Sequence, residues 1–226
     1  MPSTDSVSTP SLTTRVVRRL ARSLENLGSA KRGFKRAWPH IDGIEGYLDS
    51  PGQEEWLYQS VLGLPDPAVI VEIGSFKGRS TACIGYACRG TGKRVFAIDT
   101  FAGNDSDFRD GSEFTRGPYF DQFWGNLNRL GLTDYVTPLC GLSADIAQMW
   151  RTPIDLLFID GSHEFLDVLA DFENFFPWVR EGGIVAFHDV EPLWPGPWKV
   201  WHEVAAARLV AHGSCSTIAF GRKPGV

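Results

Sequence analysis

Residues 69–80 read Val-Ile-Val-Glu-Ile-Gly-Ser-Phe-Lys-Gly-Arg-Ser, and this stretch decides the fold class. A β-branched run that includes Ile73 is typical of a strand buried on both faces in a parallel sheet. Gly74 ends the apolar run and Gly78 stands where a helix would begin, so the stretch predicts a strand, a tight turn and a helix. The carboxylate of Glu72 is unusual there, because a purely structural strand rarely carries a charge.

A carboxylate beside a glycine turn, at the carboxyl end of a strand, can receive an amine or a hydroxyl of a ligand. The glycines let the backbone approach that ligand, and the next helix offers free N–H groups. We therefore expect Glu72, Gly74, Ser75, Gly78 and Ser80 to bind a cofactor. The spacing is E-x-G-x-x-x-G rather than the dinucleotide fingerprint G-x-G-x-x-G. A tight strand-to-helix turn without a ligand remains an alternative.

A second strand follows and ends in another acid. After a helix expected over residues 79–88, residues 94–98 read Arg-Val-Phe-Ala-Ile and lead into Asp99. Doubly wound folds place a ribose-binding carboxylate about 20 residues beyond the glycine turn. Two acids and a glycine loop at neighbouring strand ends favour a bound nucleoside.

Three segments together resemble the class I S-adenosylmethionine-dependent methyltransferases: Glu72-Ile-Gly-Ser-Phe-Lys-Gly78, Ala97-Ile-Asp99 and Phe158-Ile-Asp-Gly-Ser-His163. More narrowly, the chain resembles the group whose fourth strand ends in I-D-G-S-H and whose fifth ends in F-H-D. These are methyltransferase domain 24-like enzymes, among them O-methyltransferases of sugars and other small molecules. The resemblance covers roughly residues 50–222.

This resemblance implies an α/β fold: a doubly wound, Rossmann-like and mostly parallel sheet with helices on both faces. It implies S-adenosylmethionine as the cofactor, with Glu72 beside its methionine part and Asp99 on its ribose. The segment Cys140-Gly-Leu-Ser143 matches the position that lines the adenine, so Ser143 joins the expected cofactor-binding residues, as does Asp160.

The chemistry is expected at the ends of the fourth and fifth strands. Residues 154–159 form an apolar run that ends at Asp160, and residues 184–187 lead into His188 and Asp189. Adjacent parallel strands lie about 4.8 Å apart, so these three side chains can converge at one edge of the sheet. Two carboxylates and an imidazole suit Mg²⁺ or Mn²⁺, which could bind substrate hydroxyls and lower the pKa of one.

His163 follows Asp160 by three residues and is the expected general base, because an imidazole suits proton removal near neutral pH. In metal-dependent relatives with this layout, the acid matching Asp160 is a metal ligand and the position of His163 carries the basic residue. Those relatives usually have an acid and an amide where this chain has His188 and Asp189. The alternatives are a helix-capping role for His163 and an orienting role for His188. Asp155 is expected to be a surface charge.

Three further segments carry weaker signals. The loop 100–118 is rich in Gly, Asn and Asp and is interpreted as a substrate lid, with a surface excursion as the alternative. After the fifth strand, Trp194 and Trp198 in a proline-rich stretch could stack on a sugar ring, with a proline-rich turn that packs on the next helix as the alternative. Residues 200–210 then predict a helix and residues 216–220 a closing strand, where the resembled family has two.

Composition and charge favour a soluble domain over residues 41–226, preceded by a basic, partly disordered segment 1–40. Eight of the 22 Lys and Arg but only two of the 27 Asp and Glu lie in residues 1–40, so this segment carries +6 and the rest −11. Its helical part has no interleaved aromatic residues, and no nucleic-acid partner is expected. Packing of this helix on the domain, or on a second copy in a homo-oligomer, stays open.

No stretch is long and apolar enough to span a bilayer, and no signal-like segment opens the sequence. The four cysteines lack metal-ligand spacing and are expected to be reduced in the cytoplasm. We therefore expect a methyltransferase that acts on a hydroxyl of a small molecule, a sugar or a specialised metabolite. N-methylation of an amino sugar, a nicotinamide-dependent oxidoreductase and a non-catalytic nucleotide-binding module are the alternatives.

Overall fold

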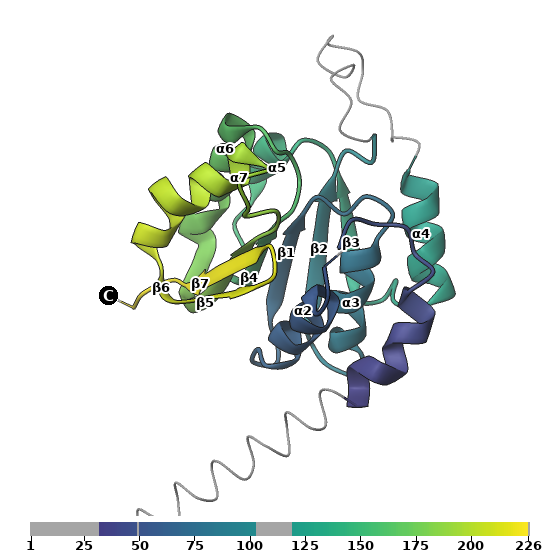
Figure 1. The fold of residues 1–226 in the computed structure, drawn as a ribbon. Helices are drawn as coiled ribbons and strands as arrows, with labels where there is room; N and C mark the ends of the chain where they lie inside the picture. The colour runs from purple at the N-terminus through teal and green to yellow at the C-terminus, as the bar shows by residue number, and fades with distance from the viewer. Residues whose placement is uncertain (1–31, 49, 103–118, 226) are drawn as a thin grey trace, which may run out of the picture.

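A sheet with strand order β3-β2-β1-β4-β5-β7-β6 runs through the described part of the chain (Figure 1). The computed structural model describes residues 32–48, 50–102 and 119–225. β1 to β5 are parallel, whereas β7 is antiparallel to both β5 and β6. The strands are β1 (Val69–Ile73), β2 (Arg94–Asp99), β3 (Val136–Cys140), β4 (Ile154–Ile159), β5 (Val179–Phe187), β6 (Val210–Cys215) and β7 (Ile218–Arg222). This confirms the expected doubly wound, Rossmann-like class.

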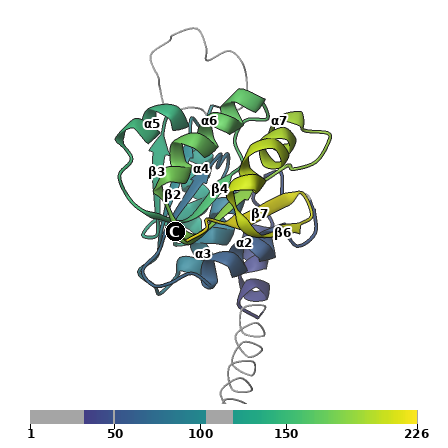
Figure 2. The ribbon, with the colours of Figure 1, turned by 90° about the vertical axis from the view of Figure 1, so that its left-hand side faces the viewer.

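Helices cover both faces of the sheet (Figures 1 and 2). One face packs against a helix at residues 32–41 and against α2, α3 and α4, and the other against α5, α6 and the helical turns after α7. The helices are α2 (Gln53–Leu62), α3 (Arg79–Cys88), α4 (Phe120–Arg129), α5 (Ser143–Met149), α6 (Phe165–Phe175) and α7 (Pro195–Lys199), with short turns at η2 (Phe176–Trp178), η3 (Val200–Ala205) and η4 (Ala206–Arg208).

Successive side chains of the central strands point to opposite faces of the sheet and pack into two separate cores. On β4, Phe158 packs in the core beneath α3 and α4, while Leu157 and Ile159 pack in the core beneath α6. All six residues of β4 are buried. A strand covered on both faces needs apolar side chains on both, which is why β4 reads as a nearly continuous apolar run. The side chain of Glu72 points toward α3. An apolar residue would be expected at this position, because the other side chains of β1 are apolar.

The strand register brings the predicted site residues to one edge of the sheet. Ile73 pairs with Ile98 of β2 and with Ile159 of β4, and Ile159 pairs with Phe187 of β5. The residues that come next along each strand are therefore neighbours. Strand order reverses between β1 and β4, and ligands of open α/β sheets bind outside the carboxyl ends of the strands at such a point.

The C-terminal part differs from the sequence-based prediction. The helix expected over residues 200–210 ends at Arg208, and Val210–Cys215 form β6, which the sequence did not reveal. β6 is the edge strand, and its mostly exposed residues show no apolar alternation that would identify it. The closing strand is confirmed as β7, so the sheet has both of the strands expected after β5 in the resembled family.

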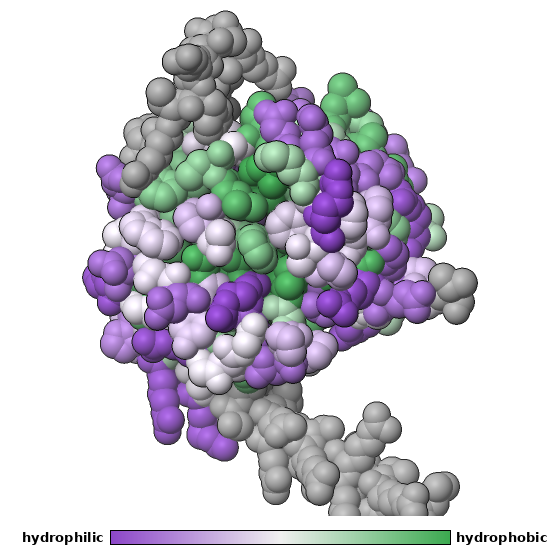
Figure 3. All heavy atoms as spheres, turned by 180° about the vertical axis from the view of Figure 1, so that it is seen from behind, coloured by the Kyte–Doolittle hydropathy of each residue, from purple (hydrophilic) through white to green (hydrophobic). Residues whose placement is uncertain are grey.

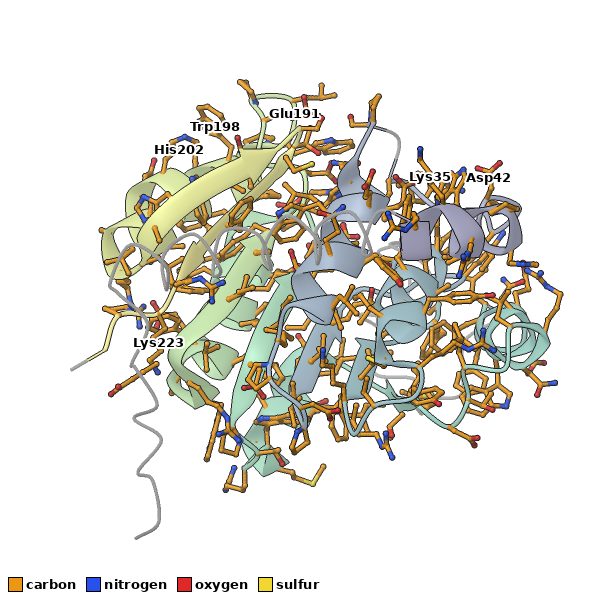
Figure 4. The ribbon with its side chains drawn as sticks, turned by 90° about the horizontal axis from the view of Figure 1, so that it is seen from below. Lys35, Asp42, Glu191, Trp198, His202 and Lys223 are labelled. Carbon is orange, nitrogen blue, oxygen red and sulfur yellow. The ribbon has the colours of Figure 1, made fainter. Side chains whose placement is uncertain are left out.

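At the N-terminal end, Phe34, Ala37 and Ile41 of the helix at residues 32–41 are buried in the main core. Figure 4 shows Lys35 and Asp42 on the outer surface at this side of the molecule. The basic segment before residue 32 and most of the predicted lid, residues 103–118, lie outside the described residues. Within the described ranges, no helix has the length and apolar character needed to cross a membrane.

Candidate active site

Glu72, the acid at the end of β1, is completely buried beneath the start of α3. Its Oε2 accepts hydrogen bonds from the Ser75 hydroxyl at 2.7 Å and from the Thr81 hydroxyl at 2.5 Å. Its other oxygen, Oε1, has no hydrogen-bond partner within the described residues. A buried acceptor without a donor is costly, so Glu72 Oε1 marks a place where a donor from a ligand would be stabilised.

Burial raises the pKa of Glu72 to about 7, although hydrogen bonds from Ser80, Thr81 and Ser75 act in the opposite direction. The nearby Asp160 carboxylate adds to the rise. Glu72 is therefore a carboxyl group that changes charge near neutral pH. A cationic amine placed at Oε1 would favour the ionised form.

Asp99, at the end of β2, holds the loop that follows β1. Its Oδ2 accepts the backbone N–H groups of Ser75 and Phe76 at 2.6 and 2.7 Å, and its Oδ1 accepts the N–H of Phe101 at 2.6 Å. The acid predicted to bind ribose thus also fixes the conformation of the glycine turn. Three hydrogen bonds leave part of the lone-pair capacity of the two oxygens free for a ligand.

The glycine turn lies directly against the loop after β4. A Cβ atom at Gly74 would come within 2.1 Å of the Asp160 backbone oxygen, so only glycine fits there. The N–H of Asp160 also donates to the backbone oxygen of Ile73 at 2.8 Å. Gly78 has a φ of 90° and precedes α3, and this left-handed conformation suits glycine. These contacts bring the loop between β1 and α3 and the loop after β4 together.

Asp160, His188 and Asp189 converge at the ends of β4 and β5, as the sequence predicted. His188 Nδ1 lies 2.9 Å from Asp160 Oδ1 and 3.1 Å from Asp189 Oδ2. His188 is almost fully buried, whereas the two acids are partly exposed. One ligand atom from each of the three residues lies within 4.8 Å of the others.

Charge coupling within this group is strong. Burial works against a charge on His188, but the Asp160 and Asp189 carboxylates outweigh it and raise the pKa of His188 to about 10. Burial raises the pKa of Asp160, with His188 acting against the rise. For Asp189, burial is outweighed by the hydrogen bond from His163 and by the nearby His188 ring, which lower its pKa far below the ordinary value.

The positions of these donors fit a divalent cation. Neither carboxylate contact of His188 Nδ1 is aligned as a hydrogen bond, so this buried nitrogen has no hydrogen-bond partner among the described residues although two oxygens lie nearby. Neighbouring ligands of an octahedral Mg²⁺, each about 2.1 Å from the ion, lie about 3 Å apart. The two distances from Nδ1 match that spacing, and the donor set of two carboxylates and one imidazole suits Mg²⁺ or Mn²⁺.

His163, the predicted base, belongs to the same cluster. Its Nε2 lies 2.8 Å from Asp189 Oδ2, the oxygen that also faces His188. The Trp194 ring stacks on the His163 ring at 4.0 Å with an angle of 21° between the planes. A Cβ at Gly196 would come within 2.0 Å of the His163 backbone oxygen, so the proline-rich loop presses directly on this histidine. Trp194 therefore holds His163 in place.

A model of the methyltransferase domain matches residues 71–190, more than half of the chain. The chain belongs to this methyltransferase family. The match begins within β1 and ends just after Asp189, so it spans both groups of side chains described above.

Several individual proteins are similar to this chain over different lengths. The uncharacterized protein y4gI of Sinorhizobium fredii (strain NBRC 101917 / NGR234) is 33% identical over 147 residues, which cover 63% of this chain but only 15% of that protein. Two solved structures share the fold with TM-scores of 0.58. They are CalS11, a TDP-rhamnose 3′-O-methyltransferase of calicheamicin biosynthesis (17% identity, 85% of this chain and 93% of that chain), and an O-methyltransferase from Bacillus cereus in complex with SAH (20% identity, 87% and 91%).

One predicted residue of the methyltransferase site has an unexpected partner. The hydroxyl of Ser143, at the start of α5, donates to the carboxylate of Asp171 on α6. Burial raises the pKa of Asp171 to about 7, and the Ser143 hydrogen bond opposes the rise. Asp171 Oδ2 faces Gly161, in the loop after Asp160. This pair could not be predicted from the sequence, because Asp171 falls on the apolar face of a helix.

Three exposed leucines follow strands at the carboxyl edge of the methyltransferase sheet. Leu142, Leu166 and Leu193 follow β3, β4 and β5, respectively, and all three are exposed. Figure 3 shows apolar surface gathered in the upper part of the rear face, at the end of the molecule where α5 and α6 lie. Trp198, by contrast, packs on His202 on the outer side of the C-terminal helical turns (Figure 4).

Proposed function

We propose that the chain transfers the methyl group of S-adenosylmethionine to a hydroxyl oxygen of a small molecule, either a sugar or a specialised metabolite. The observation that carries the proposal is that two groups of polar side chains lie next to each other at the carboxyl edge of the sheet. The buried Glu72, with an unpartnered oxygen, lies on one side, and the Asp160, His188, Asp189 and His163 cluster lies on the other. Contact between Gly74 and Asp160 joins them.

The Glu72 side suits the amino acid part of S-adenosylmethionine. Its unpartnered Oε1 could accept an N–H of the methionine ammonium group, which would remove the cost of an unsatisfied buried acceptor. Asp99 holds the loop 75–76 and has lone pairs left for ribose hydroxyls. We also assign Gly74, Gly78, Ser75, Ser80 and Ser143 to cofactor binding. The bound cofactor supplies a sulfonium-activated methyl group.

On the acceptor side, the hydroxyl must lose its proton as its oxygen attacks the methyl carbon and the carbon–sulfur bond breaks. We assign this proton to Nδ1 of His163. Because Nε2 of His163 faces Asp189, the Nε2–H donates to that carboxylate and Nδ1 keeps its lone pair. The Asp189 carboxylate then stabilises the imidazolium that forms.

A divalent cation would be held by Asp160, His188 and Asp189, where it would bind the acceptor hydroxyl and lower its pKa. The exposed side chains of Leu142, Leu166 and Leu193, which follow β3, β4 and β5, support a partly apolar acceptor. A sugar acceptor is further supported by the similarity in fold to CalS11, which is a TDP-rhamnose 3′-O-methyltransferase.

Calorimetric titration with S-adenosylhomocysteine and with NAD tests the proposal first. We expect binding of S-adenosylhomocysteine and none of NAD. Incubation with S-adenosylmethionine and a panel of nucleotide sugars, free glycosides and phenols should then release S-adenosylhomocysteine with an O-methylated product. Binding of NAD without binding of S-adenosylhomocysteine would overturn the assignment.

A further inference from the structure

Thr81, the third residue of α3, holds one of the two oxygens of the Glu72 carboxylate. Its side chain is completely buried, and its hydroxyl donates to Glu72 Oε2 at 2.5 Å. The Ser75 hydroxyl, from the turn between β1 and α3, donates to the same oxygen at 2.7 Å. The other oxygen, Oε1, is buried and has no hydrogen-bond partner among the described residues. Both hydroxyls therefore hold one oxygen and leave the other for a ligand.

The two hydroxyls determine the plane of the carboxylate. The terminal torsion of a glutamate side chain is broad, so rotation of the carboxyl group costs little by itself. A half-turn only exchanges two equivalent oxygens, whereas intermediate angles break the hydrogen bonds to Oε2 and cost free energy. The position of the second oxygen is thus set by the donors to the first.

Of the two donors, Thr81 is the one that can be removed without disturbing the turn. Ser75 also donates its backbone N–H to Asp99, so its replacement would affect both acids of the proposed cofactor site. A helical threonine often turns its hydroxyl to a backbone carbonyl three or four residues back, but the Thr81 hydroxyl donates to Glu72 instead. Its contribution to the site is therefore this one hydrogen bond.

We propose that Thr81 is a positioning residue that directs Oε1 of Glu72 toward the α-ammonium group of S-adenosylmethionine. The inference rests on the proposed function, in which Oε1 accepts an N–H of this group. It adds that the affinity gained from the ammonium group depends on Thr81. The probe for this dependence is 5′-methylthioadenosine, which has the adenosine and the sulfur but no amino acid part, and so has no group for Oε1.

The first comparison needs no substitution. Calorimetry of the natural protein should show that S-adenosylhomocysteine binds at least about tenfold more tightly than 5′-methylthioadenosine, because hydrogen bonds between charged groups are strong. Equal affinities would mean that Oε1 meets no ammonium group, and would overturn the inference. Binding of neither ligand would overturn the proposed function, so the two failures are distinguishable.

The second comparison uses Thr81→Val, which removes the hydroxyl and keeps the side-chain shape. It should weaken S-adenosylhomocysteine at least about tenfold and change the affinity for 5′-methylthioadenosine less than about twofold. Thr81→Ser keeps the hydroxyl and should retain both affinities. Thr91→Val, the matched control, makes the same change beyond the other end of α3, where the hydroxyl donates to the Cys88 backbone oxygen, and should also retain both. Equal weakening of the two ligands by Thr81→Val, or weakening of neither, would overturn the inference.

A double-mutant cycle tests whether Thr81 acts through Glu72. In a Glu72→Gln background no carboxylate remains to be positioned, so Thr81→Val should weaken S-adenosylhomocysteine by less than about twofold further. A further tenfold loss in this background would show that Thr81 acts by another route and would overturn the inference. Thr81→Ala removes the same hydroxyl and replaces Thr81→Val in both comparisons if circular dichroism shows that the valine variant does not fold.

Discussion

Nε2 of His163 lies 2.8 Å from Oδ2 of Asp189, and this pair comes from the loops after two adjacent strands. The carboxylate holds one ring nitrogen and leaves the other for proton transfer. Trp194 covers the ring face, so the histidine has little freedom to turn. The acid and the stacked aromatic ring position the proposed base more tightly than they would a histidine on an open loop.

Replacement of this base should affect the chemical step and spare cofactor binding. Positioned general bases contribute about 10²–10⁴-fold to rate, so His163→Ala should lower kcat by that order. S-adenosylhomocysteine affinity should stay within about twofold, because the Glu72 and Asp99 contacts do not involve His163. The measurements are steady-state turnover with the identified acceptor and calorimetry with S-adenosylhomocysteine.

His202→Ala is the control for this experiment, because His202 is exposed and stacks on Trp198 outside the cluster. Its kcat should match that of the natural protein. Near-normal turnover of His163→Ala would move the base elsewhere, with His188 as the next candidate.

The pKa of Glu72 predicts a pH-dependent affinity for the cofactor. Burial raises this pKa to about 7, and an ammonium group at Oε1 favours the ionised carboxylate. Below about pH 7 a proton must leave before binding, so S-adenosylhomocysteine affinity should fall on acidification, by up to about tenfold per pH unit. Titrations in buffers of different ionisation enthalpy should show proton release at pH 6. Glu72→Gln should bind weakly and show no release; an equal release from this variant would assign the proton to another group.

The raised pKa of Glu72 also makes the stability of the fold depend on pH. The folded state binds a proton on Glu72 more tightly than the unfolded state does, so this group stabilises the fold below about pH 4.5 and loses that contribution as pH rises through about 7. Asp171 acts in the same direction. Urea unfolding should show that Glu72→Gln flattens the decline of stability between these pH values. An unchanged slope would contradict the raised pKa.

Asp99 is expected to support both stability and binding. Its carboxylate accepts the backbone N–H groups of Ser75, Phe76 and Phe101, and hydrogen bonds to charged groups contribute about 1.5–3 kcal/mol. Asp99→Ala should therefore lower the free energy of unfolding by about that amount and weaken S-adenosylhomocysteine binding by at least about tenfold. Asp134→Ala removes an exposed acid and should change neither. Unchanged affinity in Asp99→Ala would remove this residue from the ribose site.

The strand ends were predictable because their signal is local. Each apolar run ends in a polar residue, and parallel strands in register bring Asp99, Asp160 and His188 to the same edge. Asp155 shows the limit of this reasoning. It was expected on the surface, yet it is buried, accepts the Val69 N–H at 2.8 Å and lies 3.5 Å from Arg180. A carboxylate at a strand start looks the same in sequence whether or not a backbone donor meets it.

Contacts between distant segments could not be predicted from the sequence, for a related reason. Gln53 Nε2 lies 3.1 Å from His188 Nε2, yet the two residues are 135 positions apart, and Gln53 lies in a helix whose periodicity says nothing about the end of β5. Ser143 and Asp171 likewise come from separate helices. Periodicity identifies which face of an element is buried, but it does not say which polar groups meet there. The hydrogen bonds that tune the site depend on tertiary packing.

The final prediction concerns the divalent cation. If Asp160, His188 and Asp189 bind Mg²⁺ or Mn²⁺, excess EDTA should abolish turnover, and either ion added back should restore it. Asp160→Asn should weaken Mg²⁺ binding by at least about tenfold, whereas Asp134→Asn should leave it unchanged. S-adenosylhomocysteine affinity should persist in EDTA, because the proposed cofactor contacts of Glu72 and Asp99 do not involve the cation. Full activity in excess EDTA would contradict a cation-dependent reaction, and Asp160 would then serve with His188 to orient Asp189 toward the base.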